Sequence, residues 1–328
     1  MTISDDDKII IDIMSSTPVI TGMMSINEIY GILKYLQYVL KNNIPGEIIE
    51  FGCFVGTVSI FIRKMLDKYN SSKEFHVYDS WEGLPEKHKK DETELSRQFN
   101  TGQFKVPRES FEKIFKHFKL TMPIIHEGLF KELDDSEYPD KIAFIFMDGD
   151  FYTSTQTALT KTYDKLQDKG CIIIDDCGWD PLPGPKIATD EFLQDKLEDL
   201  NIVAYPDKQL QFGKKNNGGV IIKGNHSINI ESTISDSSLL NYVNPTNNDL
   251  MVNSQNSKDK DVSKLYKPEE NILIYMEDVD DTENSKWVKS KVIQFVSETN
   301  KYELECDDMD EHIFMSLEPG GDNHFPML

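Results

Sequence analysis

The sequence is poor in cysteine and has none of the cysteine spacings that hold metal ions. Its 328 residues include four cysteines, and no two of them form a CxxC pair. A disulfide-rich secreted domain and a structural zinc site are therefore excluded. We expect the cysteines to be reduced thiols in a cytoplasmic protein; they are Cys53, Cys171, Cys177 and Cys306.

Basic residues are also scarce. The 35 lysines and arginines are outnumbered by 57 aspartates and glutamates, and the net charge is −22. Such a surface repels phosphate backbones and anionic membrane faces. No apolar run approaches the roughly 20 residues of a membrane helix, and the acidic stretch after Met1 has the wrong charge for a signal peptide. We expect neither nucleic acid nor membrane as a partner.

The first two thirds of the sequence alternates between short apolar runs and helical patterns. Continuous apolar strands between helices are typical of a parallel sheet that is covered on both faces. The fold class is therefore α/β, Rossmann-like, with a mainly parallel seven-stranded sheet. The expected strands are 46–51, 75–78, 123–126, 143–147, 171–174, 202–205 and 219–223, and the expected helices are 26–42, 58–69, 108–118, 154–166 and 187–197.

The last third has a different composition. Residues 225–268 are rich in serine, asparagine, threonine and aspartate and show no periodicity, which predicts a flexible polar linker. Residues 269–328 return to short alternating strands, which predicts a small all-β barrel. Residues 1–224 then form the α/β domain, and 83–107 form a long, mobile segment over its site.

A glycine motif follows the first predicted strand. It reads Glu50-x-Gly52-x-x-x-Gly56, and glycines here let the backbone approach a ligand closely. The pattern is similar to the S-adenosylmethionine (SAM) loop of class I methyltransferases and differs from the dinucleotide motif. Glu50 can organise the methionine end of SAM, and Asp79, which ends the next strand, can accept hydrogen bonds from the ribose.

Four carboxylates follow two later strands. Asp148 and Asp150 come after one strand, and Asp175 and Asp176 come after another. Strand ends of a parallel sheet meet at one edge, so these groups should repel one another unless a divalent cation lies between them. Oxygen ligands favour Mg²⁺, with Ca²⁺ or Mn²⁺ as alternatives. The competing interpretation is that the aspartates only cap helices or turns.

The sequence resembles the macrocin O-methyltransferases, a family of SAM- and Mg²⁺-dependent sugar O-methyltransferases. The resemblance runs through residues 17–223 and is strongest in two blocks, which read Asp-Ser-Trp-Glu-Gly-Leu-Pro from Asp79 and Asp-Gly-Asp-Phe-Tyr-Thr-Ser-Thr from Asp148. Further matching blocks begin at Gly46, at Glu127 and at Pro183, and the Asp175-Asp176 pair matches as well.

The resemblance implies a role for each matching residue. Asp150 would be the general base, and the metal ligands would be Asp148, Asp175 and Asp176. The residues implied in SAM binding are Glu50, Gly52, Cys53, Gly56, Asp79, Ser80, Gly128 and Asp148. The acceptor would carry a sugar, as a glycan, a nucleotide sugar or a glycosylated small molecule, and a homo-oligomer stays open.

The C-terminal region resembles Tudor-like modules in its Trp-x-Lys-x-Lys-Val run from Trp287 and in the acidic stretch from Asp307. Tyr275, Trp287 or Phe295 could form an aromatic cage for a methylated or cationic group. Alternatively, these rings are the core of the barrel. The acidic charge suits a basic or methylated peptide.

Three other functions compete with sugar methylation. A catechol-type O-methyltransferase uses similar carboxylate and metal chemistry, but its metal set ordinarily ends in asparagine, whereas Asp175-Asp176 supplies two acids here. A nucleic-acid methyltransferase is disfavoured by the acidic charge. A Tudor-like reader with a degenerate methyltransferase domain is disfavoured because the acids of the predicted site are intact.

Overall fold

The computed structural model describes residues 4–20, 23–209, 215–226, 228 and 230, together with five strands between residues 271 and 326. The described strands of the whole chain form two sheets that share no strand. One sheet lies within residues 47–222 and the other within residues 271–326. The predicted linker at 225–268 lies almost wholly outside the described residues. No helix in the described part of the chain is long and apolar enough to cross a membrane.

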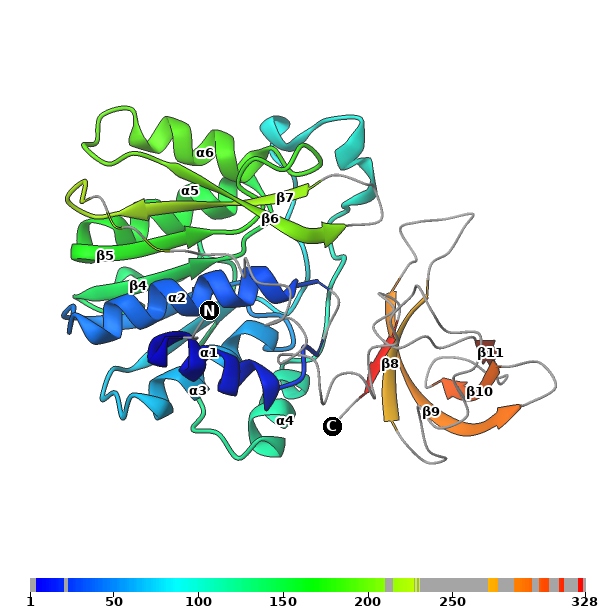
Figure 1. Ribbon diagram of the computed structural model, residues 1–328. Helices are drawn as coiled ribbons and strands as arrows, with labels where there is room; N and C mark the ends of the chain where they lie inside the picture. The colour runs from blue at the N-terminus through cyan, green and yellow to red at the C-terminus, as the bar shows by residue number, and fades with distance from the viewer. Residues whose placement is uncertain are drawn as a thin grey trace.

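The larger sheet has seven strands in the order β3-β2-β1-β4-β5-β7-β6 (Figure 1). Strands β1 to β5 are parallel, and β7 runs antiparallel between β5 and β6. This confirms the predicted Rossmann-like, mainly parallel sheet. The strands are β1 (Glu47–Phe51), β2 (Phe75–Asp79), β3 (Ile124–Glu127), β4 (Ile142–Met147), β5 (Leu166–Ile174), β6 (Asn201–Gln209) and β7 (Lys215–Ile222).

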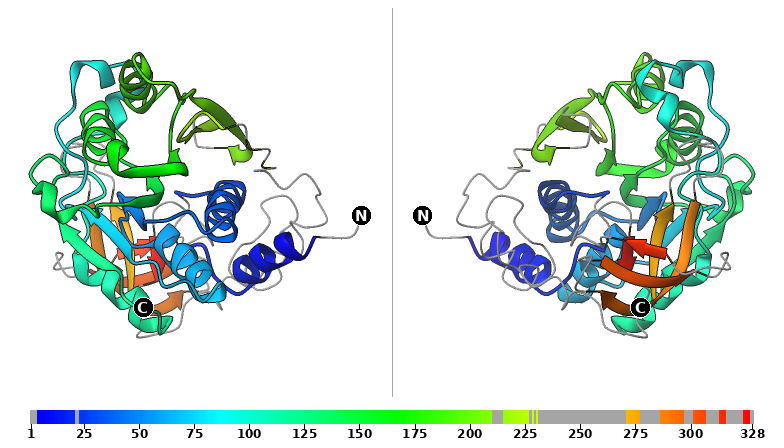
Figure 2. Two further views of the ribbon diagram at one scale, coloured as in Figure 1. Left: turned by 90° about the vertical axis from the view of Figure 1, so that its left-hand side faces the viewer. Right: turned by 90° about the vertical axis from the view of Figure 1, so that its right-hand side faces the viewer.

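Helices cover both faces of this sheet (Figures 1 and 2). One core is built from α1 to α4 and the sheet face that carries Ile48, Phe144 and Phe146; the other includes α5, α6 and the face that carries Ile49 and Ile145. Successive strand residues point to opposite faces, so a strand buried on both sides is apolar throughout. The helices are α1 (Asp5–Ser15), α2 (Ile26–Lys41), α3 (Thr57–Lys68), α4 (Arg108–His117), α5 (Tyr152–Thr162) and α6 (Gly184–Leu193).

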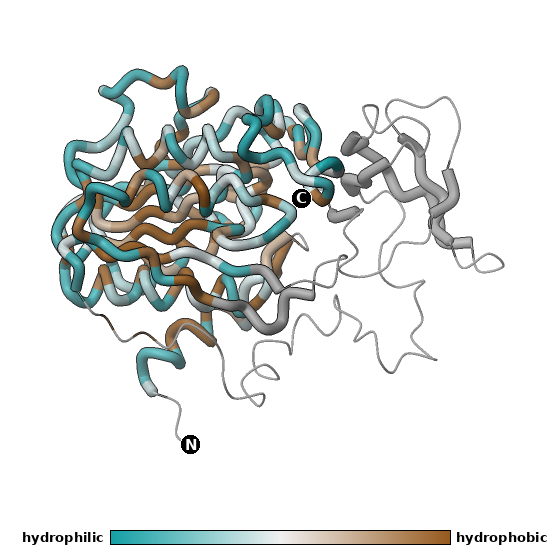
Figure 3. The backbone as a smooth tube through the Cα atoms, turned by 90° about the horizontal axis from the view of Figure 1, so that it is seen from above, coloured by the Kyte–Doolittle hydropathy of each residue, from teal (hydrophilic) through white to brown (hydrophobic). Residues whose placement is uncertain are grey.

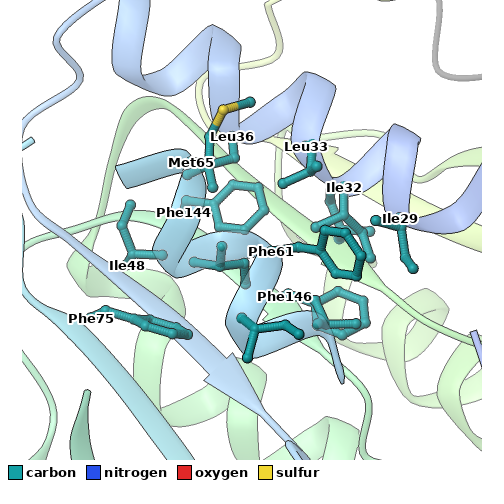
Figure 4. Close-up of a cluster of buried hydrophobic side chains, with 14 of the residues drawn as sticks. Ile29, Ile32, Leu33, Leu36, Ile48, Phe61, Met65, Phe75, Phe144 and Phe146 are labelled. Atoms are coloured by element: carbon teal, nitrogen blue, oxygen red, sulfur yellow. The ribbon is translucent and has the colours of Figure 1, made fainter. Parts of the chain in front are cut away.

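Helix α2 shows how the sequence pattern becomes a core. Ser25 and Glu28 form a capping box at its start. Its apolar residues recur at helical spacing and point at Phe61 of α3 and at Phe144 and Phe146 of β4 (Figure 4). Truncating one such phenylalanine to alanine typically costs about 3–5 kcal/mol. The brown strands inside a teal outline in Figure 3 show the same segregation over the whole sheet.

Some element boundaries differ from the prediction. Strand β5 begins at Leu166 rather than at residue 171, and the preceding helix ends at Thr162 rather than at residue 166. Leu166 pairs with Ile142 ahead of a register shift in β5. The polar residues 167–170 carry no strand pattern, so only the pairing with β4 reveals this extension. Helix α1 was not among the expected helices.

The smaller sheet has five strands in the order β11-β10-β9-β8-β12, and all its paired strands are antiparallel. An all-β arrangement was predicted here, but β12 was not. The resemblance to Tudor-like modules stays a prediction, because only the backbone of these strands is described. The strands are β8 (Asn271–Met276), β9 (Lys286–Val296), β10 (Lys301–Cys306), β11 (Ile313–Met315) and β12 (His324–Pro326).

Candidate functional site

The carboxyl ends of five parallel strands meet at one edge of the larger sheet. The residue that follows each of four strands donates its backbone N–H to a backbone carbonyl of the neighbouring strand. Gly52 donates to Tyr78 and Asp148 donates to Phe51, both at 2.8 Å. Asp175 donates to Met147 at 2.8 Å, and Gly128 donates to Asp79 at 2.9 Å. These bonds keep the strand ends in step. The predicted residues Gly52, Gly128, Asp148 and Asp175 therefore do share one edge, which is where ligands bind in open α/β sheets.

The loop between β1 and α3 can only be built with glycine at two points. Gly52 has φ +73° and Gly56 has φ +92°, in the left-handed region. A Cβ at Gly52 would collide with the carbonyl oxygen of Asp148, so the loop after β1 and the turn after β4 touch through bare backbone. Gly56 is also the N-cap of α3. The predicted glycine motif thus holds the loop close to the carboxylate turn.

Asp79 holds this loop from the neighbouring strand. Its Oδ2 accepts the backbone N–H groups of Cys53 (2.9 Å) and Phe54 (2.8 Å), and its Oδ1 accepts that of Trp81 (2.7 Å). Burial raises the pKa of Asp79, although these three hydrogen bonds favour the carboxylate. Each carboxylate oxygen has further acceptor capacity, so a ribose hydroxyl can still bind here. Asp79 therefore orders the loop, a role that the sequence did not predict for it.

Glu50 is a deeply buried acid near the end of β1, just before this loop. Its side chain is 1% exposed, and its Oε2 has no hydrogen-bond partner within the described part of the chain. Burial raises its pKa to about 8, and Asp79 adds to the shift. The hydroxyl of Ser59 lies close enough to favour the charged form, but the geometry of a hydrogen bond is not met. A buried carboxylate without a partner is suited to a cationic ligand group.

Asp148, Asp150 and Asp176 form the carboxylate cluster of the site. One oxygen from each lies within 4.8 Å of the other two, and the group could hold a metal ion. Asp150 and Asp176 both have left-handed backbones, with φ +56° and +53°, which costs about 1 kcal/mol or more for a non-glycine residue. Such strain is found at functional sites more often than elsewhere.

Asp175 is the predicted ligand that lies outside this cluster. It is 7% exposed, and it directly precedes Asp176. The structure thus brings together two of the three predicted metal ligands with the predicted base, Asp150. The separate roles of Asp150 and Asp175 stay predictions.

The segment at 83–107, called the covering segment below, crosses this edge and is cyan in Figure 1. It contains two short 3-10 helices, η1 (Lys89–Asp91) and η2 (Leu95–Gln98). Phe104 packs against Phe54 of the glycine loop, and Phe99 against Trp179, three residues after Asp176. The segment thus contacts the loops after β1 and β5.

The remaining predicted residues also lie at this edge. Cys53 is 4% exposed, and burial next to Asp79 and Glu50 raises the pKa of its thiol, so it serves through its backbone. Ser80 is half-buried, and its hydroxyl accepts the N–H of Glu82 at 3.2 Å. The sequence pattern did not single out Asp91, which lies in the short helix η1, or Trp179, which lies in the loop after β5, because neither segment has apolar periodicity. Burial of an acid in such a segment is visible only in three dimensions.

The chain matches the model of the macrocin-O-methyltransferase (TylF) family over residues 15–203. It is 33% identical over 155 residues to the 8-demethyl-8-(2,3-dimethoxy-alpha-L-rhamnosyl)-tetracenomycin-C 4'-O-methyltransferase of Streptomyces olivaceus, covering 44% of this chain and 59% of that protein. It is 28% identical over 176 residues to the demethyldecarbamoylnovobiocin O-methyltransferase of Streptomyces niveus, covering 52% and 66%. The chain thus spans less than two thirds of these curated relatives.

A solved structure gives the same result for the fold. The O-methyltransferase NovP superposes with a TM-score of 0.51 at 26% identity, and the match covers 61% of this chain and 81% of that one. The Rossmann-like methyltransferase fold is therefore shared.

Proposed function

The chain belongs to the macrocin O-methyltransferase family, and we propose that it transfers a methyl group from SAM to a sugar hydroxyl. The observation that carries this proposal is the cluster of Asp148, Asp150 and Asp176 at the sheet edge that also holds the glycine loop. In the proposal, the donor site and the proton-accepting site therefore lie side by side. The relatives are O-methyltransferases by name, and one of those names contains a rhamnosyl group.

The glycine loop fits SAM. The methionine end of SAM carries an ammonium group, and Glu50 offers a buried oxygen without a partner. A cation beside Glu50 would restore its charged form, because an opposite charge lowers the pKa of a carboxyl. Asp79 has acceptor capacity for the ribose, and Gly52 keeps the backbone close to the Asp148 turn. SAM bound here supplies a methyl group on a sulfonium sulfur.

The carboxylate cluster fits a hard divalent cation. Three carboxylates this close repel one another unless a cation or a proton is shared, and oxygen ligands suit Mg²⁺, Ca²⁺ or Mn²⁺. In the proposal, Asp148 and Asp176 hold the cation, and Asp175 keeps its family-derived role as a further ligand. A cation held by these residues would lower the pKa of the sugar hydroxyl.

Asp150 is the proposed base. It belongs to the same cluster as two of the ligands, so its carboxylate can reach a hydroxyl that is held there. The hydroxyl oxygen forms a bond to the methyl carbon while the carbon–sulfur bond breaks. S-adenosylhomocysteine leaves with the electron pair of that bond, and the hydroxyl proton passes to Asp150.

The experiment has a binding part and a transfer part. Calorimetry measures SAM binding to protein treated with EDTA and to protein with Mg²⁺; tritiated SAM is then used to screen nucleotide sugars and glycosylated small molecules. We expect SAM to bind to both preparations, and we expect methyl transfer only in the presence of Mg²⁺. Asp150→Asn should keep SAM binding and lose at least about a hundredfold in transfer rate. An absence of SAM binding by the wild type would refute the proposal.

A catechol-type activity is tested in the same screen. The second acid of the Asp175-Asp176 pair favours the sugar family. Transfer to a planar diol such as dihydroxybenzoate, with none to any sugar, would decide for the alternative.

For the C-terminal strands we propose a Tudor-like module that binds a basic or methylated peptide. An antiparallel five-stranded sheet and 16 acidic residues against four lysines between Glu269 and Leu328 support it. Full-length protein and its Trp287→Ala variant would be compared on arrays of methylated and unmethylated lysine and arginine peptides. Equal binding by both proteins would refute the aromatic cage.

A further inference from the structure

We propose that Asp91 of the covering segment is a positioning residue that fixes Asp150 for its task. The inference rests on the proposed function, because it concerns the base of that site. Asp91 is separated from Asp150 by 59 positions along the sequence, and no sequence pattern connects them. The connection is made by backbone hydrogen bonds at the start of α5.

Asp91 is a fully buried acid that accepts hydrogen bonds from two segments. It is 0% exposed. Its Oδ1 accepts the backbone N–H of Tyr152 at 2.7 Å, and its Oδ2 accepts that of His88 at 2.9 Å. Burying a carboxylate is costly unless its oxygens are satisfied, and here each oxygen has a partner. One oxygen therefore binds the covering segment itself, and the other binds the first residue of α5.

Helix α5 depends on this contact. Its own N-cap residue, Phe151, is apolar and supplies no capping hydrogen bond. The side chain that caps the helix instead comes from Asp91. A carboxylate at this position also interacts favourably with the positive end of the helix dipole.

The capped residue comes two positions after Asp150. Between them the chain makes a tight turn, in which the N–H of Phe151 donates to the carbonyl of Gly149 at 2.5 Å, and Asp150 at its centre has φ +56°. Such a conformation persists only where the surroundings fix it. On one side the turn is fixed by the bond from the Asp148 N–H to Phe51, and on the other by the bond from the Tyr152 N–H to Asp91.

Further contacts hold Asp91 in place. A Cβ at Gly184, the first residue of α6, would overlap Oδ1 of Asp91, so the two pack without space between them. Lys90 forms an ion pair with Glu191 at 2.6 Å and a hydrogen bond to the hydroxyl of Tyr152 at 3.0 Å. The η1 turn is thus attached to both α5 and α6. The position of the covering segment and the orientation of Asp150 are consequently linked.

The test uses Mn²⁺ as the probe, because it needs no acceptor. Although Asp148 and Asp176 are the proposed ligands, Asp150 belongs to the same carboxylate cluster, so a change in its orientation should alter the affinity of the cluster for Mn²⁺. Calorimetry and electron paramagnetic resonance measure the Mn²⁺ Kd of full-length wild type, Asp91→Ala, Asp91→Asn and the control Glu92→Ala, an exposed neighbour. We expect Asp91→Ala to raise the Kd about tenfold, the effect typical of a group that orients a metal site. Asp91→Asn keeps one acceptor oxygen for the Tyr152 N–H, so its Mn²⁺ Kd should lie within about threefold of the wild-type value. The Mn²⁺ Kd of the control Glu92→Ala should equal that of the wild type.

A double-mutant cycle separates positioning from general loss of structure. If Asp91 acts through Asp150, the effect of Asp91→Ala on the Mn²⁺ Kd should largely vanish in an Asp150→Asn background. An unchanged Kd in folded Asp91→Ala, or an effect that persists in full with Asp150→Asn, would overturn the proposal. If the wild type binds SAM but no Mn²⁺, the proposal is tested by amide hydrogen exchange at residues 149–152. Exchange there should be faster in Asp91→Ala than in the wild type, and equal rates in the two proteins would overturn the proposal. A wild type that binds no SAM refutes the proposed function instead.

Discussion

At the scale of single residues, the site is built from acids that the protein buries at a cost. Glu50 and Asp91 are almost fully buried, and burial raises the pKa of both. A buried carboxyl is retained where a hydrogen-bond network or a ligand compensates for the lost water. Asp91 has such a network within the protein, whereas one oxygen of Glu50 has none. Glu50 is therefore the acid whose compensation we assign to the cofactor.

The first prediction concerns Glu50→Gln. The pKa of Glu50 is about 8 in the folded protein and 4.5 ordinarily, so the folded state binds more protons between these values. Its contribution to stability is therefore present below pH 4.5 and is lost as the pH rises to 8. The glutamine variant lacks this loss, so its stability relative to the wild-type apoprotein should rise by roughly 4 kcal/mol between pH 5 and pH 8.5.

Urea denaturation of both proteins at pH 5 and at pH 8.5 measures this difference. The variant should also bind SAM at least about tenfold more weakly. Parallel pH dependences of the two proteins would contradict the assignment of the raised pKa to Glu50.

The second prediction compares two glycines. Gly52→Ala places a methyl group against the carbonyl oxygen of Asp148, whereas Gly102→Ala meets nothing within 4 Å. Both positions have positive φ, +73° and +83°, so both variants share the backbone strain. We expect Gly102→Ala to cost about 1 kcal/mol and to keep SAM binding, and Gly52→Ala to cost several times more and to lose it. Thermal unfolding and calorimetry would show this; equal behaviour would mean that the close approach is unimportant.

At the scale of elements, two segments of the site are each held by a residue from a different element. Asp79 at the end of β2 holds the loop between β1 and α3, and Asp91 of the covering segment caps α5. Because the strand ends are hydrogen-bonded in step, these cross-connections join the proposed donor half of the site to the proposed acceptor half. The loops are thereby positioned before any ligand binds, which lowers the entropic cost of binding.

The third prediction tests this arrangement through Asp79→Ala. The variant removes the acceptor of the Cys53 and Phe54 N–H groups, which then need water. We expect SAM affinity to fall at least about tenfold and stability to fall by about 1–3 kcal/mol. Glu82→Ala, a change at an exposed acid of the same segment, should alter neither. Calorimetric SAM binding that is preserved in Asp79→Ala would argue against a role for this residue in the loop.

At the scale of the whole molecule, the described strands form two separate sheets. Every residue assigned to methyl transfer lies within residues 47–222, the range of the larger sheet. The smaller sheet lies within residues 271–326, in a strongly acidic stretch of the chain. Because the two sheets share no strand, the larger sheet should fold and remain stable without the smaller one.

The fourth prediction is that a fragment ending at residue 230 binds SAM with the affinity of the full chain, within about threefold, and unfolds cooperatively. Calorimetry and thermal denaturation of both proteins would be compared. A fragment that is folded but binds SAM much more weakly would mean that the C-terminal strands contribute to the donor site.

The sequence alone determined the architecture of the larger sheet and the edge at which the candidate site lies. Apolar runs and helical periodicity are local signals, and strand ends in a parallel sheet must meet, so Gly52, Asp79, Asp148 and Asp175 could be placed at one edge. Tertiary structure decided which carboxylates converge. Left-handed turns at Asp150 and Asp176 direct their side chains toward Asp148, and Asp175 is left outside the cluster. It also decided that Asp91 caps a helix distant in sequence, because long-range hydrogen bonds leave no periodic trace in the chain.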